Sequence, residues 1–459
     1  MASAYLSRTP SSASNQKTWT WSGWIKRASI TSEQSFFGAY TGGNDYVAIQ
    51  FDSNDSLNIT YKQISATGGS LSSQTRRKIT NRLFRDVNAW YHIVVKFDAA
   101  NTNCDIYVNG SEETNFAVNE EPQNLNYAVN HTSAHYVGGF PHSATGVADT
   151  KFNGQLAHVH LADGQTYAPT VFGETDSTTG IWKPKISPSG VTYGTNGFFL
   201  KFDNSANMGL DSAGSNNLTT SGTIIQNKDT PTNVFAKLNF NDIAGTNDIT
   251  LANTGTTTMQ TGSVGDYGLR STLAATTGKY YWEAKIATSN TLCILPMETR
   301  LVINLSDGSP ANDLYGVQRY SDSTSNIYDD GTFVQNTSAM WGGITSSDII
   351  SFALDLTNGK LFLAKNGAYK NQSGATGDPV NGTNPTFTIS DTTKTYTFYT
   401  EMRGNDDNGT LVNFGDGYFG TTAVSSAQNP DDGNGIFEYD PPTGYRAWTT
   451  KGINAQEYS

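Results

Sequence analysis

The sequence predicts an all-β fold built from two consecutive antiparallel β-sandwiches. Two aromatic-rich segments, TWTWSGWIK at 18–26 and KYYWEAKI at 279–286, each begin one half of the chain and have the pattern of half-buried strands. Alternation with a period of two recurs between them, as in WYHIVVKFD at 90–98, and helical periodicity is almost absent. Tight hairpins are predicted by the Asn-Gly pairs at 109–110, 358–359 and 366–367.

Composition narrows the class of protein further. Aromatic residues make up 12% of the chain and charged residues only 15%, the opposite of the balance found in disordered chains. A net charge of -12 disfavours nucleic acid as a partner. Cys104 and Cys293 lie in different halves, so no disulfide framework is expected. No apolar run is long enough for membrane insertion, and no secretory signal is recognisable at the N-terminus.

Two domains are predicted, joined by a linker. The stretch 206–231 is polar and rich in Gly, Ser and Asn, which is typical of a connection between folded units. We therefore expect one β-sandwich over 1–205 and a second over 232–459.

The first half resembles the laminin-G-like members of the concanavalin A-like jelly-roll superfamily. The resemblance is carried by TWTWSGWIKR (18–27), SFFGAY (35–40), WYHIVVKFD (90–98), IYVNG (106–110), HYVGGF (135–140) and FNGQLAHVHLADG (152–164). Residues 167–185 and 193–202 resemble a narrower version of this domain that recurs in virion proteins of tailed bacteriophages.

The second half resembles a SPRY domain, which is also a β-sandwich. The matching segments are 267–286, 314–318, 348–367, 412–419 and 437–448. Residues 288–313 depart from the family pattern, because the family usually has a short glycine-containing strand at this place.

Catalysis is not expected. Some glucanases of the concanavalin A-like fold carry a Glu-x-Asp-x-x-Glu strand whose carboxylates flank the scissile bond. The nearest segment here, Glu174 to Thr179, lacks the final carboxylate. His158 and His160 could bridge a metal, but no further ligand accompanies them at a suitable spacing, so we expect a solvated sheet face.

Calcium is the cofactor that the laminin-G-like resemblance implies, bound at the sandwich rim by carboxylates and loop carbonyls. The candidate ligands are Asp52, Asp55, Asp406 and Asp407. None has the spacing of a known calcium loop, and turn formation is the favoured interpretation for each.

A ligand such as a glycan would be bound by exposed aromatic side chains flanked by amides. The candidates are Trp24, which alternates away from Trp19 and Trp21, and four residues near glycine-rich loops: Tyr40, Tyr46, Tyr136 and Phe140. Ordinary packing inside the sandwich is the competing interpretation of each.

The resemblances imply a virion surface protein of a tailed phage, assembled in the host cytoplasm and displayed as a knob-like head fibre, capsid decoration or tail-appendage component. We expect it to act by binding, to host-surface polysaccharide and to other capsid or tail proteins. A homo-oligomer is expected, with a trimer by analogy to other phage appendages. A purely structural decoration protein and a polysaccharide-degrading enzyme remain the alternatives.

Overall fold

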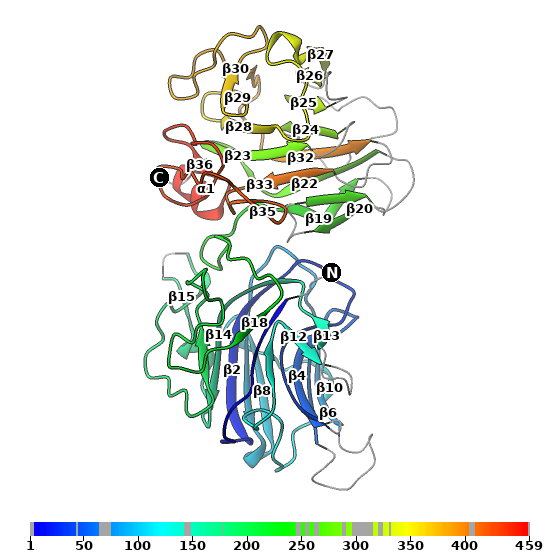
Figure 1. The fold of residues 1–459 in the computed structure, drawn as a ribbon, viewed down its shortest axis with the longest axis vertical. Helices are drawn as coiled ribbons and strands as arrows, with labels where there is room; N and C mark the ends of the chain where they lie inside the picture. Colours follow the sequence, from blue (N-terminus) through cyan, green and yellow to red (C-terminus); the bar gives the residue numbers. More distant parts are fainter. Residues whose placement is uncertain are drawn as a thin grey trace. The chain divides into compact units, whose positions relative to one another are not determined.

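The structure, a computed structural model, divides into two compact units, Met1–Gln226 and Asn227–Ser459 (Figure 1). It describes residues 4–42, 45–63, 75–141, 148–177, 179–244, 249–252, 257–260, 266–286, 291–295, 315–319, 325–329, 332–403 and 409–457. Both units consist almost wholly of antiparallel sheets, which confirms the predicted all-β class. The α-helix of the described chain is α1, Thr450–Glu457.

The first unit contains two large sheets whose strand pairs are all antiparallel. The eight-stranded sheet has, in spatial order, β10 (Phe116–Asn119), β6 (Thr75–Leu83), β5 (Ser56–Lys62), β4 (Asp45–Phe51), β3 (Gln34–Gly42), β11 (His135–Val137), β1 (Tyr5–Arg8) and β18 (Thr219–Ser221). The six-stranded sheet has β17 (Phe198–Leu200), β14 (Gly154–Asp163), β2 (Thr18–Arg27), β7 (Tyr91–Asp98), β8 (Asn103–Val108) and β9 (Ser111–Glu112).

Smaller elements complete this unit. They are the two-stranded sheets β12 (Gly139–Pro141) with β13 (Ala148–Lys151) and β15 (Gly173–Thr175) with β16 (Trp182–Pro184), and the 3-10 turns η1 (Ala99–Asn101) and η2 (Pro169–Val171).

The core of the first unit follows from the alternation of its strands. The first aromatic segment forms β2, which spans the strand predicted for it, and its inward side chains Trp19 and Trp21 are fully buried. Trp19 stacks on Phe97 of β7 with 4.6 Å between ring centroids. Burying side chains of this size supplies much of the free energy that stabilises a sandwich. Ile93, Val95 and Phe97 of β7 also point into this core, as the alternation in WYHIVVKFD predicts.

Two of the three predicted Asn-Gly turns form as two-residue hairpins, whereas 358–359 ends a four-residue connection between Asp355 and Lys360. Asn109 and Gly110 have φ values of 50° and 82° and join β8 to β9, the left-handed conformation that an Asn-Gly turn adopts most easily. Asn366 and Gly367 do the same between two strands of the second unit, with φ values of 50° and 80°.

Residues 206–231, predicted as a linker, contain β18. This strand pairs with β1 at the edge of the eight-stranded sheet, with Ser7 opposite Thr219. The chain passes from one unit to the next between Gln226 and Asn227.

The second unit is a separate sandwich with its own core. One sheet has β19 (Leu238–Ala244), β22 (Asp266–Ala275), β32 (Tyr396–Arg403), β24 (Thr291–Leu295), β25 (Tyr315–Arg319), β26 (Ser325–Asp329) and β27 (Thr332–Asn336). The other has β20 (Ile249–Ala252), β21 (Thr257–Gln260), β33 (Thr410–Asn413), β23 (Lys279–Ile286), β28 (Ile349–Asp355), β29 (Lys360–Lys365) and β30 (Ala368–Lys370), with β31 (Phe387–Thr388) on β29 and β36 (Arg446–Ala447) on β23. A short pair is formed by β34 (Tyr418–Phe419) and β35 (Thr422–Ala423), and the 3-10 turn η4 spans Thr337–Ala339.

The second aromatic segment, β23, crosses the middle of this sandwich. Trp282 points into the core and stacks on Phe352 with 5.0 Å between ring centroids. On the opposite face of β23, the buried Glu283 carboxylate accepts hydrogen bonds from the backbone N–H groups of Glu438 (2.9 Å) and Tyr439 (2.8 Å) and from the Tyr281 hydroxyl (2.9 Å). These hydrogen bonds hold the C-terminal segment against the sheet. They also satisfy the carboxylate, which could not be buried without hydrogen-bond donors.

Candidate functional site

Three of the tyrosines selected from the sequence lie on the outer face of the eight-stranded sheet. Tyr40 in β3 is the direct cross-strand partner of Tyr46 in β4, and Tyr136 in β11 pairs with Gly38 of β3. Residues next to them along the strands, such as Val47, point into the core. All three tyrosines are partly exposed. The strand order β4–β3–β11 therefore brings these distant parts of the sequence together on one face.

Phe140 lies on the same face but is a packing residue. It belongs to β12, which contacts β3 together with β13, and its side chain is 1% exposed. A Cβ on Gly38 would lie 2.3 Å from Phe140 Cδ2, so only glycine leaves room for the ring. The Phe140 and Tyr46 ring centroids are 5.1 Å apart. Phe140 thus supports Tyr46 from the side and is not itself available to a ligand.

Polar side chains of β5 and β6 extend this face. Thr60 and Lys62 of β5 lie opposite Ala48 and Tyr46, and the exposed Arg77 of β6 lies opposite Thr60. Lys62 Nζ is 5.6 Å from the Tyr46 ring centroid, a cation–π distance.

Neither Lys62 nor Arg77 was identified as a site residue from the sequence. The alternation in SLNITYK at 56–62 could have identified Lys62, because it places this lysine on the sheet face opposite to the apolar Ile59 and Tyr61. Thr60 itself is buried and its hydroxyl donates to Asn58 Oδ1 at 3.0 Å, so we call Tyr40, Tyr46, Lys62 and Arg77 the outer-face cluster.

Trp24 lies on the other sheet and is buried, with 3% of its surface exposed. Its ring stacks on His92 of β7 at 4.8 Å, and His92 in turn stacks on Trp182 of β16 at 5.9 Å. The candidate assignment of Trp24 as an exposed platform therefore has no support from its position, because β16 and its neighbours cover this face. Trp24 is a packing residue.

Ser22 and His92 lie as close as a nucleophile and its general base, but the hydrogen bond between them runs in the wrong direction for catalysis. Ser22 Oγ is 2.9 Å from His92 Nε2, and Trp182 Nε1 donates to His92 Nδ1 at 2.9 Å. An indole N–H can only donate, so the neutral imidazole carries its hydrogen on Nε2 and donates to the serine. A general base would need a lone pair on Nε2, so this pair does not activate Ser22.

The expected solvated face around His158 and His160 is wrong for His160, which is 1% exposed. A bulge in β14 gives His158 a φ of 48°. The His160 ring stacks on Phe199 at 4.0 Å, and its Nδ1 is 2.8 Å from the Tyr193 hydroxyl. Phe199 and Tyr193 therefore cover the His160 ring. Among the described residues, no group of three His, Cys, Asp or Glu side chains is placed to hold a metal ion.

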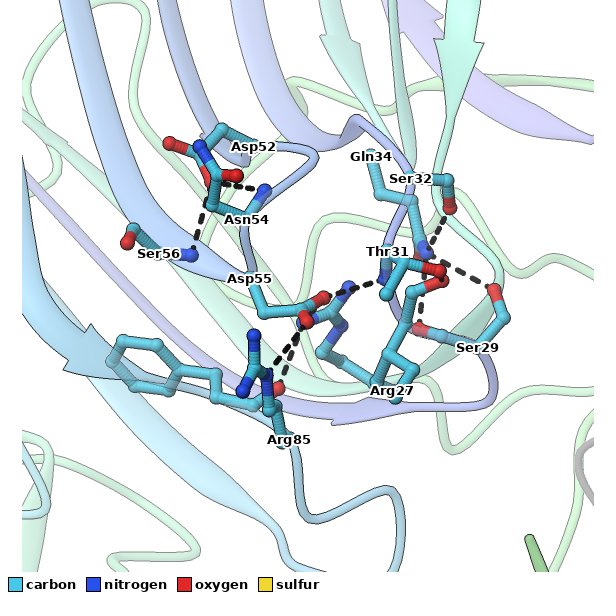
Figure 2. Close-up of polar contacts among 12 residues, drawn as sticks. Arg27, Ser29, Thr31, Ser32, Gln34, Asp52, Asn54, Asp55, Ser56 and Arg85 are labelled. Atoms are coloured by element: carbon cyan, nitrogen blue, oxygen red, sulfur yellow. Dashed lines mark hydrogen bonds and ion pairs between the residues drawn. The ribbon is translucent and has the colours of Figure 1, made fainter. Parts of the chain in front are cut away.

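The carboxylate of Asp55 is occupied by two arginines (Figure 2). Asp55 Oδ1 lies 3.0 Å from Arg27 Nη1 and accepts from the Thr31 backbone N–H at 2.6 Å, while Oδ2 accepts from Arg85 Nε at 3.0 Å. Arg27 and Asp55 are both fully buried side chains, whereas the Arg85 side chain is 57% exposed. Arg27 also donates to the Phe84 carbonyl and lies over the Phe51 ring.

This arrangement does not fit a calcium site at Asp55. An arginine already supplies the positive charge at both carboxylate oxygens, and a metal would have to displace it. Asp52 Oδ1 accepts from the backbone N–H groups of Asn54 (2.9 Å) and Ser56 (3.0 Å), which is turn chemistry (Figure 2). Asp406 and Asp407 lie outside the described residues.

Glu174 and Asp176, the acids of the segment that comes nearest to the glucanase motif, both lie beside a lysine. Lys183 Nζ lies 2.8 Å from Asp176 Oδ2 and 3.7 Å from Glu174 Oε1. Asp176 Oδ1 also accepts from the Thr179 backbone N–H at 2.9 Å. The two carboxylates stabilise the β15–β16 hairpin.

Among the described residues, no helix is long and apolar enough to cross a membrane.

Comparison with known proteins matches part of the chain to a family model. Residues 2–172 match a laminin G family model described as the concanavalin A-like lectin/glucanases superfamily. No sequence among the curated proteins matches the chain.

Three solved structures are among those similar to this chain. One is a protein from Bacteroides ovatus whose carbohydrate-binding role is itself inferred: 14% identity, TM-score 0.31, 48% of this chain covered and 56% of that chain. The SPRY domain of human HERC1 has 16% identity and a TM-score of 0.28, covering 38% of this chain and 96% of the other. Domains LG4-5 of the mouse laminin α1 chain have 10% identity and a TM-score of 0.29, covering 96% of both. The chain thus contains a laminin G-like, concanavalin A-like lectin domain over the residues matched by the family model, and it has SPRY-like structural neighbours.

Proposed function

We propose that this chain is a carbohydrate-binding protein without catalytic activity, and that the outer-face cluster of its first unit holds the glycan. The observation that supports this most strongly is the joint position of Tyr40 and Tyr46 beside Lys62 and Arg77 on one sheet face. Partly exposed aromatic rings next to charged groups are side chains that sugar recognition uses. The lectin-type family of residues 2–172 agrees with this assignment.

We further propose that the protein is displayed on the virion surface of a tailed phage and attaches the particle to host polysaccharide. The resemblance of residues 167–185 and 193–202 to phage virion domains supports this placement. Other capsid or tail proteins would be its partners, and a homo-oligomer, with a trimer by analogy, is the proposed assembly. A density map of purified particles tests the placement: the chain should occupy symmetry-related surface positions, and its absence from the particle would remove the proposal.

Binding without chemistry is supported by the engaged state of the polar groups that resemble catalytic ones. Ser22 faces a histidine that donates to it, and Glu174 and Asp176 share Lys183. A reducing-end assay on polysaccharides that the protein binds should therefore show no release above buffer.

Replacing Tyr46 by alanine should weaken glycan binding at least about tenfold, or about 1.4 kcal/mol, because the variant removes the central ring of the cluster. Tyr107→Ala is the matched control. Tyr107 lies on β8 of the other sheet, is also partly exposed, and has Lys96 Nζ at the same 5.6 Å from its ring as Lys62 from Tyr46. A glycan array probed with the full chain and both variants provides the measurement. Absence of binding to any glycan, or equal loss in both variants, would contradict the proposed function.

A further inference from the structure

The outer-face cluster carries two cations side by side. Lys62 lies on β5 directly opposite Tyr46, and Arg77 lies on β6 opposite Thr60, two residues from Lys62 along β5. Diagonal neighbours on one face of a sheet are within reach of long side chains. Arg77 is exposed and Lys62 partly so. Burial raises the pKa of Tyr46, the Arg77 charge opposes the rise, and the Glu33 charge adds to it.

Among the described residues, neither Lys62 nor the Arg77 guanidinium has a carboxylate partner. The two nearest acids serve other groups: Glu33 accepts from the Gln50 amide, and Glu120 accepts from the backbone N–H of Arg77 at 3.0 Å. The chain segments that join these strands, residues 43–44 and 64–74, contain no Asp or Glu in their sequence. Among the side chains that the structure describes, no carboxylate thus lies within ion-pair distance of these two positive charges, on a protein whose net charge is -12.

A second tyrosine–lysine pair in this unit, Tyr107 and Lys96, differs from Tyr46 and Lys62 because its lysine has a carboxylate partner. Lys96 lies over Tyr107 at the same distance as Lys62 over Tyr46, but Lys96 Nζ is also 2.9 Å from Asp105 Oδ2. That aspartate raises the pKa of Lys96 against the effect of burial. The same motif is thus neutralised on the six-stranded sheet and left charged on the eight-stranded sheet.

We infer that the glycan bound by the outer-face cluster is acidic, with a sugar carboxylate held by Lys62 and Arg77 beside Tyr46. This inference rests on the proposed function and deepens it. A guanidinium presents a planar fork that matches a carboxylate with two hydrogen bonds, and a lysine adds a point charge. The net negative charge of the chain repels polyanions at long range, so specific short-range contacts decide the affinity.

The test uses the full chain and a panel of acidic bacterial polysaccharides with polygalacturonate, each in its native form and after chemical reduction of its carboxyl groups to alcohols. Neutral dextran and dextran sulfate complete the panel. Native acidic polymers should bind, and their reduced forms should bind at least about tenfold more weakly, because a charge-assisted contact is lost. Lys62→Gln and Arg77→Gln should each reproduce that loss, and Lys96→Gln should not. Binding should also weaken with added salt.

Each other outcome overturns part of the account. Equal binding of native and reduced polymers, or binding of neutral glycans alone, would overturn the acidic ligand and leave glycan binding intact. Carboxylate-dependent binding that is unchanged by Lys62→Gln and Arg77→Gln would overturn this location. Binding of dextran sulfate but of no uronic acid polymer would replace the carboxylate by a sulfate. Binding to nothing in the panel or on a neutral array would overturn the proposed function itself.

Discussion

Lowering the pH from about 7 to about 5 should unfold the first unit and leave the second folded, because protonation of buried histidines favours the unfolded chain. All six histidines of the chain lie before residue 227. His92 and His135 are the clearest cases, since each accepts a hydrogen bond at a ring nitrogen. Trp182 Nε1 donates to His92 Nδ1, and the Asn130 backbone N–H donates to His135 Nε2 at 2.8 Å. Protonation of either ring abolishes that contact.

The pKa shifts of the buried histidines give the direction of the stability change and the pH range in which it occurs. Burial lowers the pKa of His92 from 6.5 to about 3 and those of His135 and His158 to about 4, and it lowers the pKa of His160 well below its usual value. A lowered folded-state pKa contributes stability above the unfolded value near 6.5 that is lost as the pH falls toward the folded values. Each histidine costs about 1.4 kcal/mol per pH unit in that window, so four cost about 5.6 kcal/mol per pH unit. Such a loss exhausts a typical stability of about 5–15 kcal/mol within a few pH units.

The second unit should respond in the opposite direction. Burial raises the pKa of Glu283 from 4.5 to about 7, although hydrogen-bond donors around it oppose the shift. A raised pKa contributes stability that is present below the unfolded value and lost as the pH rises through the folded one. Calorimetry of the full chain between about pH 8 and pH 4.5 measures both units at once. Two transitions that shift together, or a first-unit transition that does not change with pH, would contradict this account.

Replacing Asp55 by asparagine should cost the first unit about 3–5 kcal/mol, because it leaves the buried Arg27 charge without its counter-ion. Arg27 Nε and Nη2 already have no hydrogen-bond partner among the described residues, and the Phe84 carbonyl and the Phe51 ring, which also contact Arg27, carry no full negative charge. The loss should appear as a lower unfolding midpoint of the first unit in denaturant, with the second unit unchanged.

Arg85→Gln is the matched control for Asp55→Asn. It removes the other arginine of the same carboxylate, but the Arg85 side chain is 57% exposed, so the loss should stay below about 1 kcal/mol. Equal losses in the two variants would refute the assignment of Arg27 as the essential partner. A calcium-dependent rise of the wild-type melting temperature that Asp55→Asn abolishes would instead restore Asp55 as a calcium ligand.

Local patterns in the sequence predicted the strands and turns well. β2 and β23 were recognisable because large aromatic side chains alternate over eight to ten residues, and the Asn-Gly turns require left-handed backbone that few other residues adopt. Alternation shows which side chains share a face, but it does not show what covers that face. Trp24 was therefore misjudged, since its cover, Trp182, lies far along the chain.

The candidate site depends on contacts that no local pattern contains. Tyr40, Tyr46 and Tyr136 were selected individually, and only the strand order places them on one face. Asp55 resembled a turn residue or metal ligand because its partner Arg27 comes from a strand earlier in the chain. Lys62 and Arg77 looked like ordinary solvated charges, and the lack of an ion-pair partner for them among the described residues becomes visible only when the sheet is assembled.

A crystal structure of the full chain with an acidic oligosaccharide selected from the binding panel tests the central claim most directly. The account predicts that the sugar lies on the outer face of the eight-stranded sheet, in contact with Tyr46, with its carboxylate within hydrogen-bond distance of Lys62 or Arg77. A sugar bound at the sandwich rim beside Asp52, or in the second unit, with the outer-face cluster empty, would contradict it.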